Sequence, residues 1–211
     1  MLAQYHAAVL TETLGPLLSA RALKAIISAN LRQDSLRHQI NAPHIHFDNC
    51  AFAEGRAYIE QQHALIAAAS DAPAMWAAFG RLSHVAQDFY SHSNYVDLWL
   101  DAHGGPAHTR PDGINGLDPG LLASPALRSG YFVLWRDLIH YIPLLNRFAK
   151  KHLVAPDSHE AMNLDDPGRG PRFDYSIAAA KQRTVAEYRR AIDSLDPRRV
   201  NLFQDKRHDN G

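Results

Sequence analysis

Three side chains that can bind a metal recur every fourth residue in the stretch RLSHVAQDFYSHSNYVDLW: His84, Asp88 and His92. On a helix, four residues advance by about 400°, so these side chains share one face. Two histidines and a carboxylate are good ligands for zinc or a similar divalent ion. His84 and His92 are separated by about 12 Å along the helix axis, whereas metal–ligand bonds are only ~2 Å long. The spacing therefore predicts two or more ions along the helix, with Asp88 able to bridge them.

Two further groups of possible ligands lie in segments that are not regular helix. APHIHFDNC contains an H-x-H alternation and a carboxylate, in His44, His46 and Asp48. DSHEAMNLDDPG offers one histidine together with side-chain oxygens, in His159, Asn163, Asp165 and Asp166. Irregular backbone can place such ligands around a common centre, so both segments are candidates for the same metal site.

Each of these residues also has an ordinary structural interpretation. The helical triplet could be a solvated face on which Asp88 only orients a neighbouring histidine. Loop histidines are usually solvated, and Asp and Asn in loops more often form turns. His6 has apolar neighbours in the sequence and is by itself a core or surface histidine. Asp34 follows a predicted helix and is by itself a turn residue, so none of these residues identifies a site alone.

The composition narrows the class of protein. The chain has 211 residues, 13 of them histidine, which is typical of sites with nitrogen and oxygen ligands when cysteine pairs are absent. Lys plus Arg and Asp plus Glu both total 22, and this zero net charge argues against nucleic-acid binding by broad charge neutralisation, although a local basic groove stays open. Cys50 is the single cysteine, so no intramolecular disulfide forms.

No stretch predicts a membrane span, because no apolar run approaches twenty residues. The opening stretch MLAQYHAAVLTETLG has neither a basic start nor a continuous apolar core, so we expect no secretory signal. A chain already trimmed of its signal would look the same. The compartment is therefore left open, as cytoplasmic or reached by export without a signal.

Helical periodicity dominates the chain and strand-like alternation is nowhere sustained. We expect helices over residues 2–14, 16–31, 50–70, 72–101, 129–153 and 173–195. Asp71 and Pro73 are typical of a cap and first turn, and they place the start of the fourth of these helices. The expected fold is all-α, a single-domain bundle of about five to seven helices over residues 1–195. Residues 196–211 are expected to be a C-terminal tail, and two long loops, 103–120 and 154–172, are expected to rim the metal site.

Taken in order, five stretches of the chain resemble the HET-C heterokaryon-incompatibility-type domain over about residues 1–195. These stretches are YH, SANLRQD, HIHFDNCAF, GRLSHVAQDFYSHSNYV and HEAMNLDDPG. That family is similar to the zinc-dependent phospholipase C and single-strand nuclease superfamily. The resemblance implies an all-helical bundle that holds a cluster of three zinc ions and hydrolyses phosphoester bonds.

The resemblance also implies how the ligands are shared. One metal would take Asp34, His46, His84 and Asp88. A second would take His92, His159 and an oxygen ligand from residues 160–165. A third would share Asp88 with His6 and the amine at the start of the chain.

This sequence departs from the superfamily pattern at three points. The secreted members use an N-terminal Trp as a ligand, whereas this chain begins with Met1. They place a Glu four residues after the counterpart of His159, where this chain has Asn163, and Asp165 is the available replacement. His92 follows Asp88 by four residues rather than six, as in the HET-C branch. We therefore expect two or three zinc ions per chain.

The implied function is a metal-dependent phosphodiesterase, phospholipase C-like, that hydrolyses a phospholipid with a metal-activated water. Asp34 would ligate a metal and orient or deprotonate that water. The expected partners are a phospholipid or other phosphoester substrate and a peripheral contact with a membrane. Two alternatives stay open: a nuclease or phosphomonoesterase of the same superfamily, and a non-catalytic helical module whose metals stabilise a surface used for partner recognition or toxicity.

Overall fold

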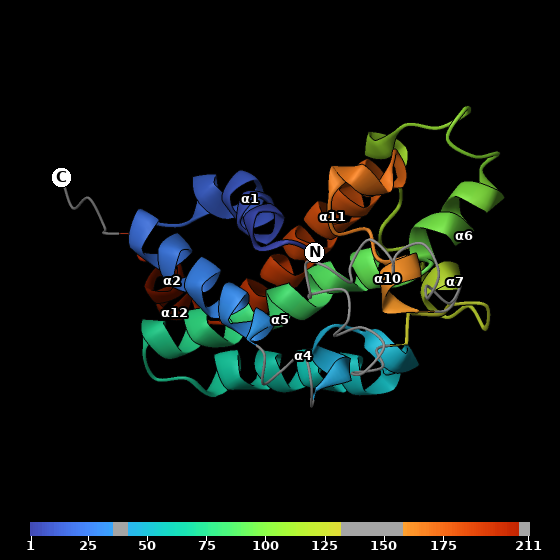
Figure 1. Cartoon of the computed structure of the whole chain (residues 1–211). Helices are drawn as coiled ribbons and strands as arrows, with labels where there is room; N and C mark the ends of the chain where they lie inside the picture. Colours follow the sequence, from blue (N-terminus) through green and yellow to red (C-terminus); the bar gives the residue numbers. More distant parts are fainter. Residues whose placement is uncertain (36–41, 132–157, 207–211) are drawn as a thin grey trace, which may run out of the picture.

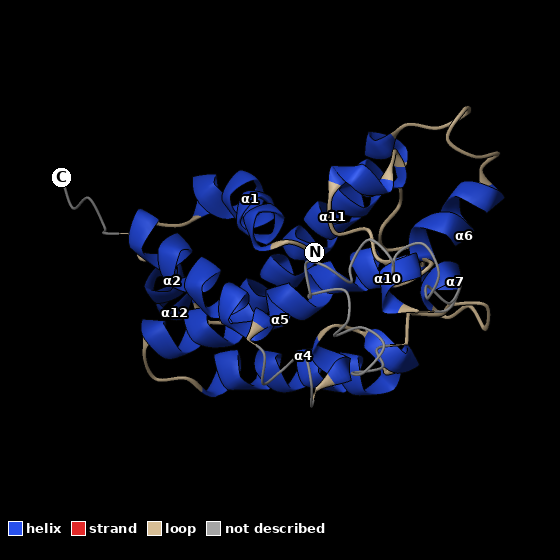
Figure 2. Ribbon diagram, viewed as in Figure 1, coloured by secondary structure: helices blue, strands red, loops and turns tan. Residues whose placement is uncertain are grey.

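The computed structural model describes residues 1–35, 42–131 and 158–206, and it leaves the side chains of His159 and Glu160 outside this description. Within these residues the chain forms helices and turns and no strand (Figure 2). The extended pairings there are isolated bridges, Ser93 with Ser129 and Tyr131 with Ser158. The all-α fold class is thereby confirmed.

Short 3-10 turns lie between some of the described helices along the chain (Figure 1). They are α1 (Ala3–Leu14), α2 (Ala20–Leu31), α4 (Phe52–Ala68), α5 (Ala72–His92), α6 (Tyr95–Ala102), α7 (Pro119–Leu122), α10 (His159–Met162), α11 (Arg172–Asp193) and α12 (Pro197–Gln204). The predicted helices over 2–14, 50–70 and 173–195 correspond to α1, α4 and α11. The helix predicted from 16 starts later, since residues 15–17 form a 3-10 turn before the N-cap Ser19 of α2.

Helix α5 is the centre of the bundle. It begins where the Asp71 side chain accepts a hydrogen bond from the backbone N–H of Ala74, with Pro73 in the first turn, as predicted. Every residue from Ser83 to His92 is buried, because α2, α4 and α11 pack around α5. A helix that is buried on all sides offers solvent-shielded positions for its polar residues, and their burial requires partners.

The single helix predicted over 72–101 is wrong, because the chain leaves helical geometry after His92. Ser93 is extended, with φ −107° and ψ 164°, and pairs with Ser129 across an isolated bridge. The backbone N–H of Gly130 donates to the carbonyl oxygen of His92 at 3.3 Å. This pairing with residues distant in sequence replaces the helical hydrogen bonds at that point, so α6 starts anew at Tyr95. Ser129 to Tyr131 are accordingly not helical, and the rest of the helix predicted over 129–153 lies outside the described residues.

The segment predicted as a C-terminal tail, 196–211, is described up to residue 206, and this part contains the packed helix α12. Asp196 caps α12 by accepting from the backbone N–H of Arg199. Phe203 is fully buried, and its carbonyl oxygen accepts a 2.6 Å hydrogen bond from the Trp76 indole. The physical reason is ordinary helix initiation by Asp-Pro followed by burial of one aromatic side chain.

Close contact between α2 and α5 is set by a glycine. A Cβ added at Gly80 would lie 2.5 Å from the carbonyl oxygen of Ile26 and 2.6 Å from the Cβ of Ala29. Only a residue without a side chain permits this approach. As a result Asn30, at the end of α2, reaches the polar residues of α5 beyond Gly80. None of the described helices combines the length and the apolarity needed to cross a membrane.

Candidate metal centre

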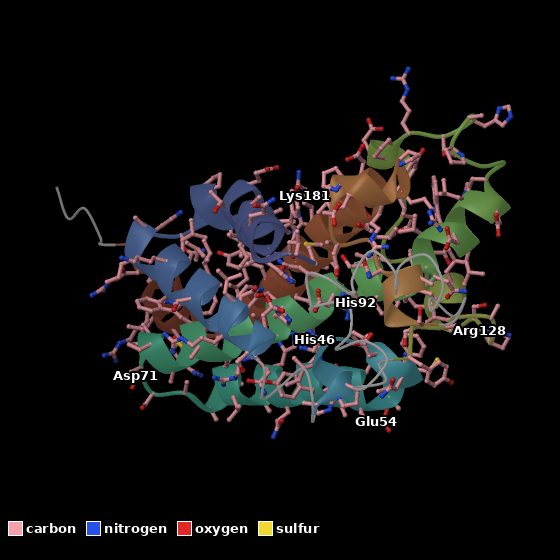
Figure 3. All side chains as sticks on the ribbon, in the orientation of Figure 1. His46, Glu54, Asp71, His92, Arg128 and Lys181 are labelled. Atoms are coloured by element: carbon pink, nitrogen blue, oxygen red, sulfur yellow. The ribbon has the colours of Figure 1, made fainter. Side chains whose placement is uncertain are left out.

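Five of the predicted ligands meet in the interior of the bundle. His84, Asp88 and His92 come from α5, His6 comes from α1, and His46 comes from the irregular segment before α4. All five are buried, with His6, His84 and Asp88 fully so. Figure 3 shows His46 and His92 in the middle of the molecule, and their ring centroids are 6.2 Å apart. The start of the chain reaches the same region (Figure 1).

The first group that could hold a metal consists of His6, Asp34, His84 and Asp88, whose ligand atoms all lie within 4.8 Å of one another. The Nε2 atom of His84 is 3.1 Å from Oδ2 of Asp88 and 3.6 Å from Oδ1 of Asp34. The Nε2 atom of His6 is 3.1 Å from Oδ1 of Asp88. Bonds of 2.0–2.2 Å to a tetrahedral zinc ion place ligand atoms about 3.3–3.6 Å apart, so these separations suit a shared ion.

The second group overlaps the first, since it consists of His46, Asp88 and His92. Nδ1 of His46 lies 2.8 Å from Oδ2 of Asp88. Nε2 of His92 lies 3.0 Å from Oδ1 of Asp165, which adds a carboxylate next to this group. His84 and His92 thus fall in different groups, with Asp88 in both, as the helical spacing predicts.

The amine of Met1 lies between the carboxylates. It is 2.8 Å from Oδ1 of Asp88, 2.7 Å from Oδ1 of Asp165 and 3.2 Å from Nε2 of His92. Burial lowers the pKa of this amine, but the charges of Asp165 and Asp88 outweigh burial and raise the pKa to about 11. Asp88, Asp165 and His92 thus surround the positively charged Met1 amine, and the same acceptor atoms are of the kinds that bind a metal cation.

Charge and burial oppose each other at Asp88 and His84. Burial disfavours the charged form of Asp88, yet the Met1 ammonium group and the surrounding histidines together hold its pKa well below the usual range. Burial is the largest effect on His84 and lowers its pKa well below the ordinary value, despite the nearby carboxylate. Asp88 is thus ionised and His84 neutral at neutral pH, which are the protonation states that metal ligands need.

His46 and Asp34 are shifted in the opposite direction. Burial alone would lower the pKa of His46, but its hydrogen bond and charge interaction with Asp88 raise the pKa overall. Burial, followed by repulsion from Asp88, raises the pKa of Asp34. Asp34 and Asp88 therefore lie close enough to repel each other in the first group.

Two buried ring nitrogens without hydrogen-bond partners among the described residues indicate whether the cluster suits a metal ion. Nε2 of His6 and Nε2 of His46 are buried and have no hydrogen-bond partner in the described part of the chain. Nε2 of His6 is only 3.1 Å from the Asp88 carboxylate, but the geometry is not that of a hydrogen bond. An unsatisfied buried polar atom costs about 1–3 kcal/mol, and coordination to a cation would remove that cost. The donor set therefore fits a divalent ion with nitrogen and oxygen ligands.

The grouping differs from the one that the resemblance implies. The structure places His6 beside Asp34 and His84, whereas the resemblance assigns it to a separate ion. Asp165 contacts His92 directly, and Asn163 is buried two residues before it. The side chain of His159 lies outside the described residues, so its ligand role stays a prediction.

His44 and His103 belong to neither of the two groups. His44 packs edge-on against Tyr58 at 5.6 Å, and His103 stacks on Trp99 at 4.1 Å. Their rings serve packing on the adjacent helices.

Sequence reasoning missed the buried polar residues behind the ligands, Asn30, Gln87 and Thr184. A signal for Gln87 was present, since it follows His84 by three residues and so lies on the same helical face. Asn30 and Thr184 gave no such signal, because only the packing of three helices brings them together.

Together, the fold and the site define an all-α protein with two overlapping buried His/Asp groups that could hold metal. Among protein families, the sequence model of the VWA7 N-terminal domain matches residues 2–103. Human von Willebrand factor A domain-containing protein 7 is 38% identical over 80 residues, which are 36% of this chain and 9% of the human protein. The match thus spans less than a tenth of that relative's length. No solved structure matches this chain.

Proposed function

We propose that this protein is a metal-dependent phosphoesterase, phospholipase C-like, whose two His/Asp groups hold two or three zinc ions. The observation that carries the proposal is the sharing of Asp88 between the two groups. Imidazole and carboxylate ligands suit zinc, and neighbouring ions a few ångströms apart are the usual arrangement for phosphoester hydrolysis. Under this proposal Asp165, with His159 and Asn163 from the same segment, completes the set around His92.

Access from solvent supports a catalytic rather than a purely structural site. The Asp88 side chain is 1% exposed, whereas Asp34 is 29% and Asp165 is 21% exposed. The cluster thus reaches the surface through two carboxylates, and catalytic zinc sites keep one position open for water or substrate. A closed structural site would have no need of such an opening.

Zinc ions held here would polarise a phosphoryl oxygen and lower the pKa of a water molecule. Asp34 would orient that water and accept its proton, since burial and repulsion from Asp88 make its carboxylate more basic than usual. Asp88 would stay ionised throughout, because its pKa is held well below the usual range. The segments predicted as loops are 103–120 and 154–172; residues 154–157 lie outside the described residues, and 159–162 form α10. Under this proposal these segments would rim the metal site and select a phospholipid headgroup.

The test begins with metal content, measured as ions per chain by mass spectrometry on protein purified without chelator. The same protein is then assayed against a chromogenic phosphocholine diester, a simple aryl phosphodiester, an aryl phosphomonoester and single-stranded DNA. We expect two or three zinc ions and preferential hydrolysis of the phosphocholine diester, abolished by chelator and restored by zinc.

Other outcomes separate the alternatives. Preferential hydrolysis of DNA or of the monoester would replace phospholipid with those substrates while keeping the chemistry. Stoichiometric zinc without hydrolysis of any substrate would contradict the enzyme proposal and favour a metal-stabilised module. Failure to bind zinc in a folded protein would contradict the metal site itself.

A further inference from the structure

Behind the first metal group lies a chain of buried hydrogen bonds that begins at His6. Nδ1 of His6 is 2.6 Å from Oε1 of Gln87, and Nε2 of Gln87 donates to Oγ1 of Thr184 at 3.0 Å. The Thr184 hydroxyl donates its single proton to the carbonyl oxygen of Ala180 at 2.8 Å. Thr184 can therefore only accept from Gln87, which turns the amide oxygen of Gln87 toward His6. An amide oxygen only accepts, so Nδ1 of His6 carries the proton.

A parallel chain of hydrogen bonds begins at His84. Nδ1 of His84 is 3.4 Å from Oδ1 of Asn30, whose Nδ2 donates to Oγ of Ser83 at 3.2 Å and to Oε1 of Gln87 at 3.3 Å. The Ser83 hydroxyl donates to the carbonyl oxygen of Gly80 at 2.9 Å, so it accepts from Asn30. The Asn30 oxygen then faces His84, and Nδ1 of His84 also carries the proton.

The two chains form one network that is closed to solvent. Its side chains come from α1, α2, α5 and α11 and are all fully buried: His6, Asn30, Ser83, His84, Gln87 and Thr184. Each chain ends on a helix carbonyl, so the direction of donation is anchored by backbone. The rings of His6 and His84 stack with their centroids 4.4 Å apart.

Reversing both amides gives a competing arrangement of this network. Asn30 and Gln87 would then donate to the histidine Nδ1 atoms, and the protons of His6 and His84 would move to Nε2. Nε2 of His6 would become a donor 3.1 Å from Asp88, but it makes no hydrogen bond in that position. The geometry at Nε2 therefore favours a lone pair there rather than a proton.

We infer that Gln87 and Asn30 are positioning residues, which hold His6 and His84 in the Nδ1–H tautomer and so direct both Nε2 lone pairs at the first metal group. Thr184 and Ser83 act one step further back by fixing the amide orientations. This inference rests on the proposed metal site but not on any hydrolytic activity. Partners of this kind typically change metal affinity by about 10- to 100-fold when they are removed.

The direct test is the tautomeric state of the two histidines in the metal-free protein. Long-range ¹H–¹⁵N correlation NMR on histidine-labelled protein, at a pH where both rings are neutral, distinguishes Nδ1–H from Nε2–H. We expect Nδ1–H for His6 and His84, assigned with His6→Gln and His84→Gln. An Nε2–H tautomer at His6 in wild-type protein would overturn the inference, whatever the outcome for zinc content or activity.

Matched variants separate positioning from packing. Gln87→Met removes the acceptor but keeps a side chain of similar size. Gln87→Glu keeps an oxygen facing His6, and the Thr184 hydroxyl can rotate to donate to the other carboxylate oxygen. For Gln87→Met we expect a dissociation constant for zinc that is about 10- to 100-fold higher than in wild type, together with mixed His6 tautomers. For Gln87→Glu we expect both properties to stay near their wild-type values. Thr184→Val should weaken zinc binding and Thr184→Ser should not. Equal zinc affinity in Gln87→Met and wild type, with both folded by circular dichroism, would contradict the positioning role.

Discussion

His84 and Asp88 face a common centre from one turn of α5, with Nε2 of His84 3.1 Å from Oδ2 of Asp88 and both side chains fully buried. The i, i+4 relationship supplies the contact, because side chains four residues apart are neighbours on a helix. Because both side chains are buried, the neutral histidine and the ionised carboxylate require further partners in the core. The other oxygen of Asp88 faces His6 and the Met1 amine, so one carboxylate connects the whole cluster.

Removing Asp88 should empty both groups. We expect Asp88→Ala to reduce bound zinc from two or three ions per chain to fewer than one and to abolish phosphoester hydrolysis, because no other residue belongs to both groups. Mass spectrometry of metal content and the diester assay measure the two effects. Asp97→Ala is the control, since Asp97 is a half-buried residue that pairs with Arg172 and belongs to neither group, and it should change neither. Unchanged zinc stoichiometry in Asp88→Ala would contradict the bridging role.

Asp34 should matter more for turnover than for metal content. Asp34→Asn keeps the size and one oxygen of the side chain but removes its ability to accept a proton. We expect kcat to fall by about 10²–10⁴-fold, the usual contribution of a general base. The second group does not contain Asp34, so its zinc should be retained. A variant with wild-type kcat would show that another group takes the proton.

The stability of the chelator-treated protein should pass through a maximum near pH 6.5. The pKa of His84 is lowered in the folded state, so the unfolded chain alone takes up a proton below about 6.5 and stability falls as pH decreases. The pKa of His46 is raised, so its contribution is complete below 6.5 and is lost as pH rises through the raised value.

Urea unfolding between pH 5.5 and 8 measures this profile. His46→Gln should flatten the alkaline side of the maximum. An alkaline limb that survives in His46→Gln would assign it to another residue.

Gly80 should tolerate no side chain. In Gly80→Ala the new Cβ would meet the backbone of α2, so we expect a loss of about 1–3 kcal/mol in the free energy of unfolding. The better helix propensity of alanine, worth up to ~1 kcal/mol, would offset only part of this loss. Displacement of α2 should also weaken zinc binding through Asn30. Gly113→Ala places its Cβ in open space and should change stability by less than about 0.5 kcal/mol.

The sequence alone predicted the helical class and most of the helix positions, because amphipathic periodicity and capping residues act locally. The cap at Asp71 and the common face of His84, Asp88 and His92 are examples. The break after His92 and the docking of α12 were not predictable, since both depend on partners far along the chain: Ser129 in one case and Trp76 in the other.

The spacing of His84, Asp88 and His92 determined that two ligand groups should share one carboxylate, because helical rise fixes how far apart the histidines stand. Only the tertiary structure decided which residues join each group, as His6 and His46 arrive from separate segments. It alone also decided the protonation of the ligands, through burial of His84 and through the network from Asn30 and Gln87. These properties depend on low polarity and exact contacts in three dimensions, and residue types along the chain do not encode them locally.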